Sequence, residues 1–143
     1  MNENPLQDFE KARCYLGIAI YYLKTEMTEN ALAALREGRL QFPRFCDNYI
    51  QAAEIYYNTQ DFRKAIDLCK ASLIECEGSV WCNKYDINTF YPYYIIGLSY
   101  GRLGELEKSV CYLSIAASMN TYEPDVKKYL DESTEKLIQQ LKQ

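Results

Sequence analysis

The six cysteines are the side chains in this sequence with the greatest capacity for chemistry. Thiolates bind zinc or form disulfides, and zinc sites usually show closely paired cysteines or histidines. The sequence has no Cys-x-x-Cys pair and no histidine, which predicts reduced thiols that serve as small apolar side chains. Only Cys69, Cys76 and Cys82 form a loose cluster, and a metal site or a disulfide there is the alternative interpretation.

The carboxylates and glycines show no catalytic pattern either. General acid–base catalysis needs titratable side chains that converge in one pocket, and the acidic residues here are scattered along the chain. No glycine-rich loop is present to hold a phosphate. The sequence therefore predicts a protein that is not an enzyme, with no catalytic, cofactor-binding or metal-binding residues.

The composition argues against two further classes of partner. A formal net charge of −4 is unsuited to nucleic-acid binding, which needs a basic surface. No run of about 18 apolar residues is present, so we expect no membrane span. The first residues, MNENPLQDFEK, are polar and acidic rather than a signal peptide, so we expect a cytoplasmic protein.

Residues 45–77 show the periodicity of two amphipathic helices separated by a polar break at residues 58–61. The apolar faces of these helices are formed by Tyr49, Ala52, Ala53 and Tyr56 and then by Ala65, Cys69 and Ser72. Small residues at these positions allow two helices to approach closely. A helical hairpin of this kind cannot bury its apolar face alone, so it needs copies of itself on either side.

The same residue types recur before and after this hairpin. The buried positions expected 34 residues earlier are Tyr15, Ile18, Ala19, Tyr22, Ala31, Leu35 and Gly38. Ala19 rather than Gly17 takes the small position in this register, because choosing Gly17 would force an insertion into the turn. A third copy has Tyr93, Ile96, Gly97, Tyr100, Gly104, Ser109, Leu113 and Ala116. A repeat of 34 residues is typical of tetratricopeptide repeats.

The segments between and beyond the repeats are less regular. Residues 80–89 are an insertion with the tryptophan Trp81, interpreted either as an apolar flap over a repeat junction or as a functional loop. Residues 124–142 predict a last helix that caps the stack or pairs with a second protomer. We expect a flexible lead-in at residues 1–7, with Asp8 as the first N-cap. Residues 8–143 then form one domain with repeats at about 12–45, 46–79 and 90–123.

The three copies resemble tetratricopeptide repeats over nearly the whole chain. The resemblance implies an all-α fold of three helical hairpins in a right-handed superhelical stack with a C-terminal capping helix. Residues 90–109, FYPYYIIGLSYGRLGELEKS, and 42–48, FPRFCDN, are also similar to the repeat region of bacterial family 2 glycosyltransferases. The catalytic domain and Asp-x-Asp motif of that family are absent, so the resemblance implies an accessory part that serves dimerisation or docking of an acceptor protein.

The concave side of such a stack is the expected binding surface, because the first helix of each repeat lines it. The positions expected to face this groove are Arg13, Ile20, Lys24, Asp47, Ile50, Glu54, Tyr57, Asn58, Tyr91, Tyr94, Leu98 and Arg102. Tyrosine and arginine commonly dominate binding energy, so the set is suited to holding a peptide. The alternative is that these side chains only cover the inner surface or contact an adjoining domain.

One specific role of tetratricopeptide repeats is disfavoured. Repeats that clamp the acidic tails of heat-shock chaperones carry Lys and Asn at fixed groove positions. The matching residues here are Leu16, Ile20, Gln51, Tyr91 and Ile95, which lack the charged donors for a carboxylate. The favoured function is a non-catalytic interaction module that binds a protein or peptide partner, within or accessory to a glycosyltransferase-type protein. The alternative is a homo-oligomeric scaffold, with a homodimer formed through the C-terminal helix or the 80–89 insertion.

Overall fold

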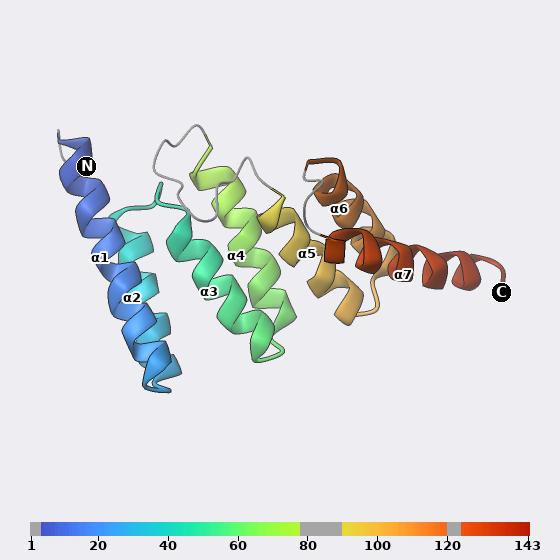
Figure 1. The fold of residues 1–143 in the computed structure, drawn as a ribbon, viewed down its shortest axis with the longest axis horizontal. Coiled ribbons are helices and arrows are strands. Elements are labelled where there is room, and N and C mark those ends of the chain that lie inside the picture. Colours follow the sequence, from blue (N-terminus) through green and yellow to red (C-terminus); the bar gives the residue numbers. More distant parts are fainter. Residues whose placement is uncertain (1–3, 78–89, 120–123) are drawn as a thin grey trace.

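The structure, a computed structural model, describes residues 4–77, 90–119 and 124–143. The described helices are α1 (Pro5–Lys24), α2 (Thr28–Gln41), α3 (Asp47–Asn58), α4 (Phe62–Glu75), α5 (Tyr91–Arg102), α6 (Leu106–Met119) and α7 (Pro124–Leu141). Successive helices pair as the hairpins α1–α2, α3–α4 and α5–α6, which stack side by side, and α7 follows at the end (Figure 1). The predicted all-α stack of three hairpins with a capping helix is confirmed. The insertion at 80–89, with Trp81 and Cys82, lies outside the described residues.

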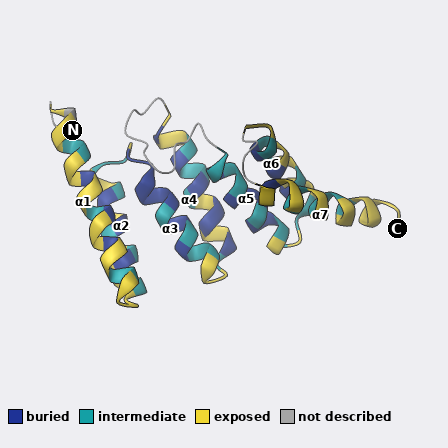
Figure 2. Ribbon diagram, viewed as in Figure 1, coloured by how far each residue is buried: buried dark blue, intermediate teal, exposed yellow. Residues whose placement is uncertain are grey.

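Two buried clusters of the hydrophobic core reach across the junctions between hairpins, and buried residues occur along all three hairpins (Figure 2). One buried cluster joins the first two hairpins through Ala12, Leu16, Ala19, Ala31, Leu35, Phe45, Ala52 and Ile55. A second joins the next pair through Ile50, Ala53, Ala65, Ile66, Cys69, Ile95, Ile96 and Tyr100. Because each cluster draws on two hairpins, each hairpin depends on its neighbours for burial.

The small residues confirm the register predicted from the repeat. Ala19 and Ala53 are fully buried, and the backbone of Gly97 lies close against Leu113 of α6. Gly17 is exposed, and a Cβ placed on it would meet no atom within 4 Å. Ala19, and not Gly17, therefore occupies the close approach between helices.

The three turns within the hairpins share one backbone conformation. The second turn residue has a positive φ in each: 60° at Glu26, 66° at Gln60 and 79° at Gly104. The next residue closes each turn, since the N–H groups of Asp61 and Glu105 donate to the carbonyls of Tyr56 and Tyr100 at 2.8 Å and 3.0 Å. Only the third turn has glycine, the residue that adopts a positive φ without strain.

This difference gives a prediction for stability. Gln60→Gly should raise the free energy of unfolding by about 1 kcal/mol. Glycine adopts a positive φ without the strain that a residue with a Cβ has in this conformation. Gly104→Ala should lower the free energy of unfolding by about 1 kcal/mol, although a Cβ there has open space. Urea unfolding measures both. Asn58→Gly, in the last turn of α3, is the control and should be destabilising; a loss of stability in Gln60→Gly would contradict the strain at this turn.

The first helix begins earlier than the sequence suggested. Pro5 lies in its first turn, and Oδ1 of Asn4 accepts a hydrogen bond from the Gln7 N–H at 3.3 Å. The prediction of Asp8 as N-cap was wrong, and residues 5–7 belong to α1 rather than to a lead-in. Proline is well tolerated in the first turn of a helix, where its missing N–H costs nothing, so α1 can begin at Pro5.

One residue of the predicted buried stripe is exposed. Ile18 has 41% of its surface exposed, whereas Ala52 and Ile96, its counterparts in the next repeats, are fully buried. The reason is position in the stack. Ala52 and Ile96 each pack against the preceding hairpin, and no described helix lies against the corresponding face of α1 and α2.

The last helix caps the third hairpin with its N-terminal part, and its final residues extend past the hairpin. Val126 is fully buried, and the Ser133 hydroxyl lies 3.1 Å from that of Ser109 on α6. Its C-terminal end projects beyond the stack (Figure 1) and leaves Ile138 and Leu141 exposed. The apolar stripe of α7 therefore continues past the surface that it covers.

Candidate functional site

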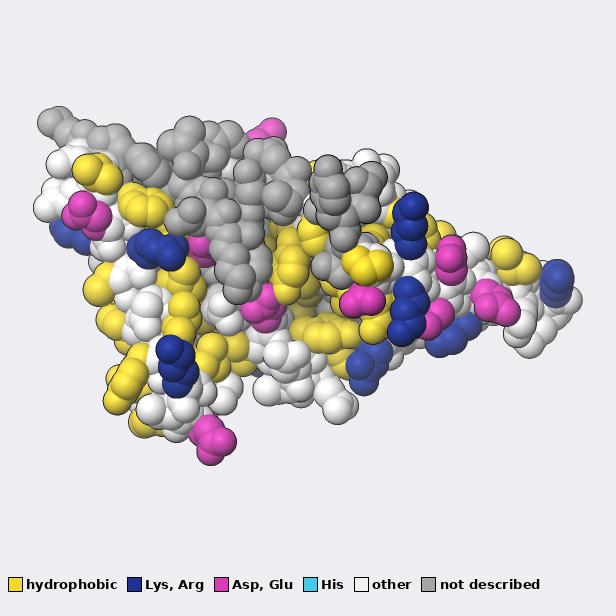
Figure 3. All heavy atoms as spheres, viewed as in Figure 1, with side chains coloured by type: hydrophobic (Ala, Val, Ile, Leu, Met, Phe, Trp, Pro, Cys, Tyr) yellow, Lys and Arg dark blue, Asp and Glu magenta, His cyan; other side chains and the backbone are white. Residues whose placement is uncertain are grey.

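A cleft opens between the C-terminal halves of α3 and α5 and the capping helix. Its volume is about 180 Å³. It is lined by Tyr57 of α3, by Leu98, Gly101 and Arg102 of α5, by Leu106, Ser109 and Leu113 of α6, and by Tyr129, Glu132, Ser133 and Lys136 of α7. On the face shown in Figure 3, hydrophobic side chains gather in the middle of the molecule, and charged side chains lie along α7.

One buried aromatic ring positions two of the predicted groove residues. Phe62, the first residue of α4, packs edge-on against Tyr57 with ring centroids 5.4 Å apart. The guanidinium carbon of Arg102 lies 5.0 Å from the centre of the same ring. This cation–π contact holds the Arg102 side chain over an apolar support while its charge remains exposed. Sequence reasoning did not single out Phe62, because it belongs to the second helix of its repeat.

The capping helix forms one wall of the cleft. Tyr129, Glu132 and Lys136 recur at the three- and four-residue spacing of one helical face. Tyr129 packs against Tyr94 of α5 with centroids 6.4 Å apart, which fixes this wall against the third repeat. These residues were not among the predicted groove positions, because the helix at residues 124–142 was interpreted as a cap or a dimer contact, and the groove was expected to be lined by the first helix of each repeat.

Aromatic side chains continue from the cleft toward the start of α5. Phe90, Tyr91 and Tyr94 pack on one another with centroids 5.8–6.4 Å apart. The Tyr91 hydroxyl donates to Oε1 of Glu54 on α3. Glu54, Tyr91 and Tyr94 were all predicted groove residues, and the structure brings them together as a link between α3, α5 and α7.

The other predicted positions are more varied. Asp47 and Ile50 are fully buried, which corrects the expectation that they face an open groove. Ile50 belongs to the core cluster between α3 and α5, and Asp47 lies at the start of α3, 4.0 Å from the guanidinium of Arg13. The remaining predicted residues, Arg13, Ile20, Lys24 and Asn58, are exposed and do not line the cleft.

The described cysteines are free thiols, and most of them are buried in the packing between helices. Cys46, Cys69 and Cys76 are buried free thiols, while Cys14 and Cys111 are exposed. Burial raises the pKa of the Cys69 thiol, which keeps it protonated and unreactive. Cys69 lies in the α3–α5 core, whereas Cys76 packs with Cys46 and Tyr49, so these two do not share one cluster. Among the described residues, no group of three or more His, Cys, Asp or Glu side chains is placed to hold a metal ion.

Other shifted pKa values also lie away from the cleft. Burial is the main cause that raises the pKa of the buried Tyr49 to about 12 and lowers that of Arg39, which lies over the Tyr49 ring. On α4, the pKa of Lys70 is raised mainly by its hydrogen bond to the Tyr100 hydroxyl. None of the described helices has the length and apolar character needed to cross a lipid bilayer.

Comparison with known proteins defines the fold. No protein family is matched by the sequence, and a comparison with curated proteins finds no match. The N-terminal domain of stress-induced protein-1 (STI-1) from C. elegans superimposes with a TM-score of 0.75, at 14% identity, over 94% of this chain and 99% of that chain. The first TPR domain of Spaghetti (RPAP3), bound to the HSP90 peptide SRMEEVD, gives 0.77 at 15% identity, over 90% and 94%.

A further similar structure is MamA, with a TM-score of 0.76 and 17% identity. The match covers 90% of this chain but only 64% of MamA. The stacked hairpins, the positive φ shared by their turns and these superpositions all indicate the same fold. This chain has the fold of a tetratricopeptide-repeat domain.

Proposed function

We propose that this chain is a non-catalytic protein-interaction module that holds a peptide in the cleft between α3, α5 and α7. The observation that carries the proposal is the lining of that cleft by Tyr57, Arg102 and Tyr129. Tyrosine and arginine are the residue types that most often dominate binding energy. The Spaghetti (RPAP3) domain, which has the same fold, is bound to a peptide.

The dimensions and charges of the cleft suggest how a peptide is held. A volume of about 180 Å³ is well below the 300–1,000 Å³ typical of sites that enclose a small molecule. It suits a single anchoring side chain, with Leu98 and Leu113 as the apolar floor. Arg102 and Lys136 lie on opposite walls with one carboxylate, Glu132, beside them, so an anchor with an acidic neighbour is favoured.

The test compares two lysines on the same helix. A phage-displayed peptide library is selected on the purified chain, and the enriched peptides are titrated by fluorescence anisotropy. Lys136→Glu should weaken binding about tenfold, as should Tyr129→Ala, because both alter the cleft. Lys127→Glu makes the same charge change on an exposed residue of α7 outside the cleft and should leave affinity unchanged.

Two outcomes would count against this site. Equal peptide affinity of the Lys136→Glu, Tyr129→Ala and native chains would mean that the peptide binds outside this cleft. Failure of the selection to enrich any peptide would contradict the proposal. The SRMEEVD peptide is a useful comparison. We expect no saturable binding of it, because Leu16 and Ile95 are buried apolar residues where a carboxylate clamp needs donors.

A narrower proposal is that the partner is a glycosyltransferase-type domain. It is supported by the resemblance of residues 90–109 and 42–48 to glycosyltransferase repeat regions. Co-expression with a family 2 transferase domain, followed by purification through a tag on that domain, tests it. Retention of the native chain and loss of the Tyr129→Ala variant would support the proposal, whereas no retention of the native chain would contradict it.

A further inference from the structure

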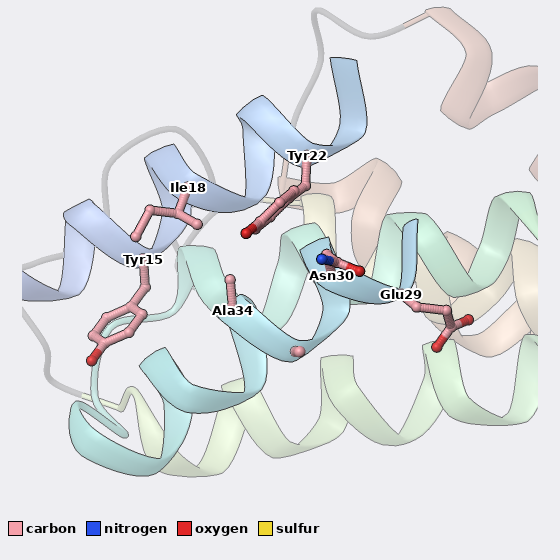
Figure 4. Close-up of a pocket in the computed structure, with 7 residues that line it drawn as sticks. Tyr15, Ile18, Tyr22, Glu29, Asn30 and Ala34 are labelled. Atoms are coloured by element: carbon pink, nitrogen blue, oxygen red, sulfur yellow. The ribbon is translucent and has the colours of Figure 1, made fainter. Parts of the chain in front are cut away.

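The outer face of the first hairpin carries a second, shallower cleft of about 510 Å³. Figure 4 shows its lining: Tyr15, Ile18 and Tyr22 follow one another along α1, and Ala34, Asn30 and Glu29 follow along α2. Ala33 completes it. The cleft is mainly apolar, and the exposed Ile18 lies between Tyr15 and Tyr22 along α1 (Figure 4).

The counterparts of these cleft residues in the later repeats show that this surface is one through which hairpins pack. Ala52 and Leu68, which lie 34 positions after Ile18 and Ala34, pack in the cluster that joins the first two hairpins. Ile96 and Tyr112, a further 44 positions on, pack in the cluster that joins the next two. These positions are therefore the ones through which each hairpin docks on the hairpin before it. On the first hairpin the same positions line an open cleft that no described helix covers.

The opposite end of the molecule carries a matching apolar feature. The projecting end of α7 presents Leu137, Ile138 and Leu141, and 69% of the Leu141 surface is exposed. Residues at i, i+1 and i+4 lie on one helical face, which is the pattern of an amphipathic helix that fits into an apolar groove. Figure 1 shows this end extending past the stack, away from the other described helices.

Charge favours the end of α7 over a second outer cleft as the occupant. Glu29 lines the cleft, and Glu37 lies farther along α2 and accepts a hydrogen bond from Gln41, which also donates to the Tyr15 hydroxyl. The exposed lysines Lys136 and Lys142 flank the apolar end of α7. Lys142 would therefore meet Glu29, whereas two outer clefts placed together would bring the two Glu29 side chains together.

We propose that the chain associates head to tail with itself, with the projecting end of α7 of one copy seated in the α1–α2 cleft of the next. The two surfaces differ, so the contact is heterologous and each copy retains one free cleft and one free helix end. Such an association extends to chains or closes into rings rather than stopping at a symmetric dimer. A single helix end supplies few side chains to the contact, so we expect a weak association that appears at micromolar concentrations and above.

The association is measured by light scattering of the full chain over a concentration series. Reductant is present throughout, because Cys14 and Cys111 are exposed and could form disulfides. The weight-average mass should rise with concentration beyond that of two chains. Ile18→Glu and Leu141→Glu should each restore the mass of one chain. Ile20→Glu is the control for the first, since Ile20 is 39% exposed on the same helix; Leu40→Glu, at 68% exposure, is the control for the second.

Mixing the two defective variants decides the geometry. The Ile18→Glu chain keeps an intact α7 end and the Leu141→Glu chain keeps an intact cleft, so together they should form a dimer and nothing larger. If two clefts paired with each other, Leu141→Glu would still associate; if two α7 helices paired, Ile18→Glu would. Either result overturns the head-to-tail contact, as does a native chain of unchanging single-chain mass.

Discussion

A chain that ends at residue 123 is expected to aggregate and to lose its cooperative unfolding transition. The N-terminal part of α7 covers the third hairpin, where Val126 is completely buried and Ser133 lies against Ser109. Burial of the Val126 side chain alone contributes about 1.5–3 kcal/mol. That is a large share of the roughly 5–15 kcal/mol that holds a domain folded. The shortened chain would also expose the apolar residues of α5 and α6 beneath α7.

The control for this deletion is a chain that ends at residue 137. It lacks only residues 138–143, all of which are exposed. Circular dichroism during urea unfolding should give it nearly the midpoint of the native chain, while size-exclusion chromatography should show the residue-123 chain as aggregate. The longer of the two chains should also fail to associate head to tail, because it lacks Leu141. A soluble residue-123 chain with a sharp transition would show that α7 is not a cap.

The repeat could be predicted from sequence because its energetics are local and periodic. Close approach of two helices requires a small residue, and the spacing of Ala19, Ala53 and Gly97 follows from that requirement. The turn within each hairpin is also repeated. Glu26, Gln60 and Gly104 all have a positive φ, although only one of them is glycine. Of the described cysteines, Cys46, Cys69 and Cys76 are buried, as expected for small apolar side chains, whereas Cys14 and Cys111 are exposed.

The candidate site was less predictable because a periodic pattern does not report which neighbour is present. Ile18 follows the buried stripe of its repeat, yet it is exposed because no described helix lies against it. Tyr129 and Lys136 belong to a helix whose apolar face suggested a cap, and their role in the cleft depends on how α7 lies across α5 and α6. Ile50 shows the converse, since a position assigned to the groove is buried by the next hairpin.

Substitution of glycine by alanine should change the free energy of unfolding in opposite directions at two helical positions. Alanine favours a helix over glycine by about 1 kcal/mol. Gly17 is exposed in α1 with no atom near a new Cβ, so Gly17→Ala should raise the free energy of unfolding by about 0.5–1 kcal/mol. At Gly97 in α5, a Cβ would lie 2.6 Å from Cγ and 3.0 Å from the backbone nitrogen of Leu113. There the helices must separate, and Gly97→Ala should lower the free energy of unfolding by about 1–3 kcal/mol.

The two variants also test the register itself. If Gly17 rather than Ala19 occupied the crossing in the first hairpin, Gly17→Ala would be the damaging change, because the first two helices could not approach. Urea unfolding of both variants, with circular dichroism at 222 nm as the signal, gives the two signs directly. Part of the clash at Gly97 is with the Leu113 side chain, so Gly97→Ala should cost less in a Leu113→Ala background. Its cost there should not vanish, because the backbone nitrogen of Leu113 remains at the same short distance from the new methyl group.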